Sequence, residues 1–121
     1  MKKQAWLFLM LALGWSAAIG AWISEYRQAE VHYMVYGGGL ADRSAPSKGD
    51  RKIAFQLKGN AARDMFNAIG PDIEDHCAAD SDTRVRARDH ENISCIRSKG
   101  KYFCNFGFDL TTGKSIGGLV C

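Results

Sequence analysis

The residues best suited to chemistry are the four cysteines, Cys77, Cys95, Cys104 and Cys121. A thiolate can attack a substrate when a base is placed beside it, can bind a metal, or can form a disulfide. His76 and Cys77 have no second histidine or cysteine at zinc-site spacing, and no Gly-x-Ser-x-Gly motif is present. We therefore expect the cysteines to form two disulfide bonds, and we expect no catalytic residue.

The acidic segment from Asp72 to Asp82 is the best candidate for a metal site. Its acids are Asp72, Glu74, Asp75, Asp80 and Asp82, and it contains His76. Asp80 and Asp82 have the spacing that begins a calcium loop, but Arg84 stands where another oxygen ligand is needed. A solvated loop is favoured, and we expect no metal; a metal-binding or enzymatic domain using His76 is the least favoured alternative.

The segment Thr112-Gly113-Lys114-Ser115 is similar to the end of a phosphate-binding loop. That motif requires a glycine five residues before Gly113, where this chain has Phe108, and a helix that follows directly. The residues that follow continue a strand pattern instead. The segment is interpreted as a turn, and no cofactor is expected.

A row of arginines, Arg84, Arg86 and Arg88, alternates with small apolar residues. On a strand, this alternation places all three on one face. A nearby hairpin adds Arg97, Lys99 and Lys101. These six residues are the candidate partner-binding surface. Two readings stay open: the row binds an anionic partner, or it is a solvated face that pairs with neighbouring acids.

The last thirty or so residues, from Asn92 to Cys121, are expected to form a three-stranded meander. A two-residue turn at Lys99-Gly100 places Cys95 opposite Cys104. A second turn, Thr111 to Lys114, would place Leu110 opposite Ser115 and Cys104 opposite Cys121. Cys104 can bond only one of its neighbours. We prefer Cys104–Cys121 with Cys77–Cys95, because it fastens the last residue; the alternative is Cys95–Cys104 with Cys77–Cys121.

The middle of the chain predicts two more strands and a helix. Apolar residues alternate in Glu30–Tyr36 and in Arg51–Lys58, and a turn-rich loop from Gly37 to Asp50 joins them. A helix is expected to start at Gly59-Asn60 with Asn60 as its N-cap, to pack Ala62, Met65, Phe66 and Ile69 on the sheet, and to stop at Gly70-Pro71. The predicted fold is α+β: a small antiparallel sheet of about four to six strands with one short helix and two disulfides.

The first 23 residues predict export. Lys2 and Lys3 precede an apolar run, Ala5 to Ile23, which is either a signal peptide cut after Ala18 or Gly20, or an uncleaved single-pass anchor in the inner membrane. Residues 24–121 would be one periplasmic domain. Removing the two leader lysines lowers the formal net charge from +3 to +1, so bulk charge gives no reason to expect nucleic acid.

The sequence favours a non-enzymatic exported domain that works by binding, such as an inhibitor- or immunity-type module. Its partner would be a protein or an anionic envelope component, and the contact surfaces would be the Gly37–Asp50 loop and the arginine row. The main alternative is an accessory subunit attached to the inner membrane through Ala5–Ile23.

Overall fold

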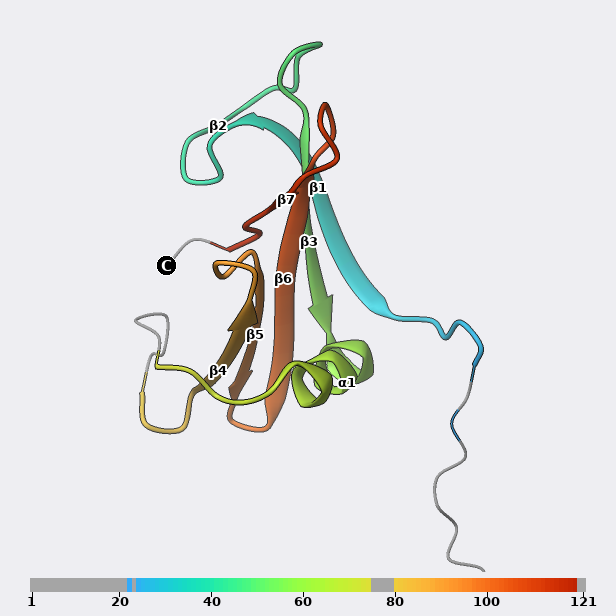
Figure 1. Cartoon of the computed structure of the whole chain (residues 1–121), viewed down its shortest axis with the longest axis vertical. Coiled ribbons are helices and arrows are strands. Elements are labelled where there is room, and N and C mark those ends of the chain that lie inside the picture. Colours follow the sequence, from blue (N-terminus) through green and yellow to red (C-terminus); the bar gives the residue numbers. More distant parts are fainter. Residues whose placement is uncertain (1–21, 23, 75–79, 120–121) are drawn as a thin grey trace, which may run out of the picture.

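The computed structural model describes Trp22, residues 24–74 and residues 80–119. They form an α+β fold in which one helix packs on a seven-stranded antiparallel sheet (Figure 1). The elements are β1 (Glu30–Gly38), β2 (Arg43–Ser44), β3 (Lys52–Lys58), α1 (Gly59–Ile69), β4 (Arg84–Arg88), β5 (Ile93–Ser98), β6 (Lys101–Asp109) and β7 (Ser115–Ile116). The predicted fold class is confirmed. The strand number exceeds the expected four to six because β2 and β7 are two-residue strands.

The long strand β6 lies at the centre of the sheet. The strand order is β2-β1-β3-β6-β5-β4, and β7 also pairs with β6. Residues 103–109 of β6 pair with β3, whereas β5 pairs with residues 101–105 and β7 with residues 107 and 108. Because β3 occupies one side of β6, β5 and β7 must share the other side, one after the other. The expected meander is therefore interrupted: β3 lies where the last strand was expected.

The first predicted hairpin register is confirmed. Cys95 lies opposite Cys104, and Arg97 lies opposite Tyr102. A disulfide joins Cys95 to Cys104, with a Cα–Cα distance of 4.0 Å. The preferred pairing of Cys104 with Cys121 and Cys77 with Cys95 is therefore wrong. On its other side Cys104 faces Leu57 of β3. Cys77 and Cys121 lie outside the described residues.

The second predicted hairpin register is wrong by two residues. Phe108, and not Leu110, lies opposite Ser115. The amide of Asp109 donates to the Lys114 carbonyl over 2.8 Å, so four residues form the loop instead of two. The Asp109 carboxylate stabilises this wider turn, because it accepts hydrogen bonds from the amide and the hydroxyl of Thr111 at 2.9 and 2.6 Å.

Helix α1 covers the lower part of one sheet face (Figure 1). Ala62 and Phe66 are fully buried against the Cys95–Cys104 disulfide, and Met65 and Ile69 pack at the edge of this core, as predicted. The predicted N-cap, Asn60, is wrong: the N-cap is Lys58, two residues earlier, and it makes no side-chain capping bond. Gly59 has a φ of 62°, which lets the chain turn directly from β3 into the helix.

Candidate functional site

The three arginines of β4 lie on the helix side of the sheet, and two of them hold the end of α1. Arg86 Nη1 donates to the carbonyl of Phe66 at 2.9 Å, and Arg88 Nη2 donates to the carbonyl of Gly70. The last carbonyls of a helix have no partner within the helix. Because the last turn of α1 has no basic residue of its own, the arginine row supplies these donors from the neighbouring strand.

Asp72 pairs with the first two arginines of the row. Its carboxylate accepts hydrogen bonds from Arg84 Nε at 2.7 Å and from Arg86 Nε at 2.8 Å. These two guanidinium groups, Arg84 first and Arg86 second, lower the pKa of Asp72 from 3.8 to about 2. The row is therefore partly neutralised within the molecule, as the solvated-face reading expected.

Of the other predicted partner-binding residues, Arg97 continues the arginine row, because it lies opposite Arg84 in the β4–β5 pairing and on the same face. Arg97 lies over the ring of Tyr102, with its Cζ 5.7 Å from the ring centre. The backbone amide of Lys99 donates to the carboxylate of Asp82 at 3.1 Å. Lys101 lies at the N-terminal end of α1, whereas the arginine row holds the opposite end of the helix.

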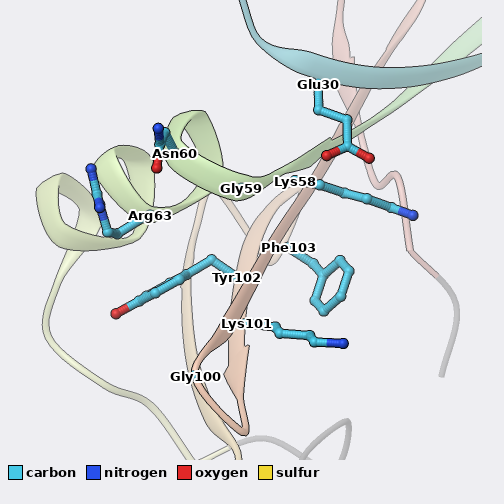
Figure 2. Close-up of a pocket in the computed structure, with 9 residues that line it drawn as sticks. All are labelled: Glu30, Lys58, Gly59, Asn60, Arg63, Gly100, Lys101, Tyr102 and Phe103. Carbon is cyan, nitrogen blue, oxygen red and sulfur yellow. The ribbon is translucent and has the colours of Figure 1, made fainter.

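Lys101 lines a pocket of about 460 Å³ beside the start of α1. Figure 2 shows Lys58, Phe103 and Lys101 projecting to one side of the strands and Tyr102 and Arg63 to the other. The Lys58 ammonium lies 5.8 Å from the centre of the Phe103 ring. The cations of this pocket diverge and do not point at a common ligand position.

Asp72, Asp80 and Asp82 of the acidic segment have partners inside the chain. Asp72 holds the arginines, Asp80 accepts the amide of Asp82 at 2.9 Å, and Asp82 accepts the amide of Lys99. Within residues 24–74 and 80–119, no three His, Cys, Asp or Glu side chains lie close enough to share a metal ion. His76 lies outside the described residues, so the metal hypothesis there stays a prediction.

The Gly37–Asp50 loop is fastened at its base. Asp50 Oδ2 accepts the amide of Gly38 at 2.7 Å, and its other oxygen accepts a hydrogen bond from Lys52. Lys52 Nζ also donates to the Gly38 carbonyl at 2.8 Å. The bond from Lys52, and then that from Gly38, lowers the pKa of Asp50. These bonds between Gly38, Asp50 and Lys52 hold the two ends of this predicted contact surface together.

An apolar patch is the most conspicuous surface of the described residues. We use this name for Val31, Tyr33 and Val35 of β1, Phe55 of β3, and Phe106 and Phe108 of β6. The registers place all six on the helix side of the sheet, above the part that α1 covers. Tyr33 is 70% exposed, Val35 43% and Phe108 38%. The rings of Phe55 and Phe106 stack at 5.3 Å, and Phe108 meets Phe106 edge-on.

The period-two alternation of the sequence places Phe106 and Phe108 on one face of a half-buried strand, and it gives no sign that this face stays exposed. A signal for the patch was present in the length of the helix. Eleven residues make a helix about 16 Å long and about 10 Å wide. The neighbouring strands β1, β3 and β6 lie about 5 Å apart and are up to about 30 Å long. One such helix therefore cannot cover the whole apolar face.

No protein-family model, no curated protein and no solved structure matches this chain. Among the residues that the structure describes, no helix is long and apolar enough to cross a membrane.

Proposed function

We propose that this chain is an exported, non-enzymatic binding domain that holds a protein partner against the apolar patch. The observation that carries the proposal is the set of exposed side chains on β1 and β6, with the half-buried rings of Phe55 and Phe106 between them. Contiguous exposed apolar surface rimmed by polar residues is typical of interaction sites. Aromatic residues are also enriched at the centres of protein interfaces.

Two further features support a binding role. The patch is built on three adjacent strands of a sheet that a buried disulfide and the helix core stabilise. Side chains on such a frame have few conformations to lose when a partner binds. Export is supported by the apolar leader and by a disulfide in the domain, because disulfides persist in oxidising compartments. An inhibitor or immunity protein would use a rigid surface of this kind.

The arginine row is a weaker contact surface than the sequence suggested. Arg84 and Arg86 are committed to Asp72, and Arg86 and Arg88 donate to the end of α1. A partner would have to compete with these bonds. Replacing the row with alanine would also loosen the helix, so loss of binding in that variant would not identify a contact surface.

The test uses a photo-cross-linking amino acid in place of Phe108 in the exported full chain. Irradiation of intact cells is expected to give a covalent adduct with another protein. The matched control carries the same amino acid at Asn67, an exposed position on α1. Identification of the adduct by mass spectrometry names the partner.

The proposal predicts that Phe108→Ser abolishes co-purification of that partner, while Asn67→Ser does not. Adducts formed equally from both positions, adducts with phospholipid alone, or no adduct from position 108 would contradict it. N-terminal sequencing of the exported protein shows whether the leader is cleaved or retained. A retained Ala5–Ile23 segment would make the same domain a membrane-anchored accessory subunit.

A further inference from the structure

The outer edge of β1 is open from Glu30 to Tyr36. On its inner side, β1 pairs with β3 along this whole stretch. On its outer side, β2 pairs only with Gly37 and Gly38. Among the described residues, no other strand meets this edge. It is a seven-residue template for another extended chain.

The ladder determines which backbone groups face this open edge. Cys95 and Cys104 are 4.0 Å apart at Cα, which is the close spacing of a non-hydrogen-bonded antiparallel pair. Cys104 therefore directs its N–H and C=O toward Leu57 of β3. Alternation across β3 then directs the N–H and C=O of Val31, opposite Leu57, outward.

Backbone groups of alternate residues in a strand point to the same side, so the residues two and four positions after Val31 are oriented as Val31 is. Tyr33 and Val35 therefore also present their amide and carbonyl groups at the open edge. The same alternation of backbone groups holds at the opposite edge of the sheet. There the Val85 carbonyl points outward and accepts the Ile73 amide at 2.8 Å. Six backbone groups of β1 thus face outward without a strand partner in the described chain.

The β4 edge of the sheet is covered, whereas the β1 edge is open. At the β4 edge, the Ile73 bridge and the pairing of Asp72 with Arg84 and Arg86 cover the strand. The open stretch of β1 contains no proline and no lysine, and its pairing with β3 is continuous, without a bulge. Proline, lysine and bulges are the usual devices that keep an edge strand from pairing. Their absence marks this edge as an interaction surface.

We propose that the open β1 edge pairs antiparallel with the same edge of a second copy of this chain. The open stretch runs from Glu30 to Tyr36, and its midpoint is Tyr33. A two-fold axis at Tyr33 places Val31 opposite Val35 of the second copy, and Tyr33 opposite its equivalent. The pattern Val-x-Tyr-x-Val reads the same in both directions, which is the self-complementarity that a two-fold interface requires.

This register satisfies the outward backbone groups completely. Val31 exchanges two hydrogen bonds with Val35 of the second copy, Tyr33 exchanges two with its equivalent, and Val35 exchanges two with Val31 of the second copy. Glu30 is the one acidic residue of the stretch and lies opposite an uncharged Tyr36, so no like charges meet across the axis.

The pairing goes beyond the proposed function, because it uses the edge of β1 and not its apolar face. It produces one continuous sheet across two copies. Their apolar patches then lie side by side on the same face, since the side chains of Val31, Tyr33 and Val35 stay on the helix side. The dimer would offer a partner a surface about twice as large.

The first test reads the register directly by disulfide cross-linking. His32 and Met34 flank the axis, and each faces the other residue of the second copy in a non-hydrogen-bonded pair, where Cα atoms come closest. Two full-length chains with different tags, one His32→Cys and one Met34→Cys, are co-exported from a bacterial host. We expect a disulfide-linked dimer that contains both tags, confirmed by its linked peptide.

Each single-cysteine variant, expressed alone, is a control for this test. Neither variant expressed alone should cross-link through its new cysteine, because position 32 does not face position 32. A Thr112→Cys chain, altered in the exposed turn before β7, should also stay unlinked. Absence of the mixed dimer, or equal cross-linking by the single variants, would overturn the proposed register.

The second test measures association in solution. The exported full chain is purified in mild detergent, so that a retained leader stays soluble, and its mass is measured by light scattering over a range of concentrations. Tyr33→Lys places two like charges at the axis and is expected to weaken dimerisation by about tenfold or more. Phe108→Lys, on the apolar face away from the edge, should leave dimerisation unchanged within about twofold.

A chain that is monomeric at every concentration, or a dimer that Tyr33→Lys leaves intact, would overturn the proposal. Cross-linking of position 32 to a different protein alone would assign the edge to another occupant and would also overturn it. The proposed function has separate readouts: it fails when position 108 contacts no partner, whatever the state of the β1 edge.

Discussion

The guanidinium of Arg86 lies over Phe66 near the end of α1: its Cζ is 4.1 Å from the centre of the Phe66 ring, and its Nη1 donates to the Phe66 carbonyl. One side chain thus contacts both the largest buried ring of the core and one of the unpaired helix carbonyls. The same guanidinium binds Asp72 through Nε. Arg86 therefore couples strand β4 to helix α1 and to the segment that follows the helix.

Arg86→Ala is expected to lower the free energy of unfolding by about 2–3 kcal/mol. The variant loses charged hydrogen bonds and a cation–π contact at a side chain that is 16% exposed. Arg97→Ala removes an arginine that contacts one ring at 5.7 Å and should cost less than about 1 kcal/mol. Urea unfolding monitored by circular dichroism measures both. Equal costs for the two variants would contradict this account of the row.

The pairing of Asp72 predicts acid sensitivity. The pKa of its carboxyl is lowered to about 2 in the folded chain, by the hydrogen bonds from Arg84 and then Arg86, and is about 3.9 in an unfolded one. A group with a depressed folded pKa stabilises the fold above its unfolded pKa. That contribution is lost as the pH falls from about 4 to about 2.

Asp72→Asn is therefore expected to flatten the dependence of the unfolding midpoint on pH between about 4 and 2. Added salt should weaken the wild-type effect, because the carboxylate is partly exposed and its ion pairs are screened. Thermal melts at a series of pH values measure this, with Glu74→Gln as the control acid. An unchanged slope in Asp72→Asn would show that the pairing does not stabilise the fold.

The Cys95–Cys104 disulfide predicts a definite peptide map. Digestion of the oxidised protein should release a linked peptide that contains Cys95 and Cys104. If two bridges form, as the sequence predicts, the second joins Cys77 to Cys121. Replacing Cys95 and Cys104 together by alanine should cost about 2–3 kcal/mol, the value expected for closing a loop of about ten residues. A linked Cys77–Cys95 peptide would overturn this map.

Substitutions of Phe66 and Phe108 are expected to differ in cost, because one residue lies in the core and the other on the surface. Phe66 is 1% exposed and packs on the disulfide, so Phe66→Ala is expected to cost about 3–5 kcal/mol. Phe108 is 38% exposed and its ring meets Phe106 edge-on, so Phe108→Ala should cost less than about 1.5 kcal/mol. Denaturant midpoints of both variants give the comparison. A large cost at Phe108 would assign the apolar patch to folding and weaken its case as a binding surface.

Local patterns were sufficient for most of the elements. The helix face of Ala62, Met65, Phe66 and Ile69, the β5–β6 hairpin and the alternation that places the β4 arginines on one face were predicted from spacing alone. Each depends on neighbours in the sequence, where helix and strand periodicity acts directly. The loop after β6 was predicted two residues too short, because hydrogen bonds from Thr111 to the Asp109 side chain select a wider loop.

The candidate site could not be read in the same way. Sequence reasoning located the arginine row but not the helix carbonyls and the Asp72 carboxylate that occupy it, since these groups come from distant segments. It grouped the aromatic residues of β6 but could not know which strand would lie beside them or where the helix would stop. The apolar patch exists because of those two facts.

The sequence by itself determined that this chain forms strands, one amphipathic helix and a close approach of Cys95 and Cys104, since each follows from the periodicity of a short segment. Only the tertiary structure decided that β3 inserts beside β6 and thereby gives Cys104 the neighbour Leu57 in place of the last strand. The same insertion leaves β1 at an open edge and the aromatic face half covered. Strand order depends on long-range pairing, and short-range patterns do not encode which strands become neighbours.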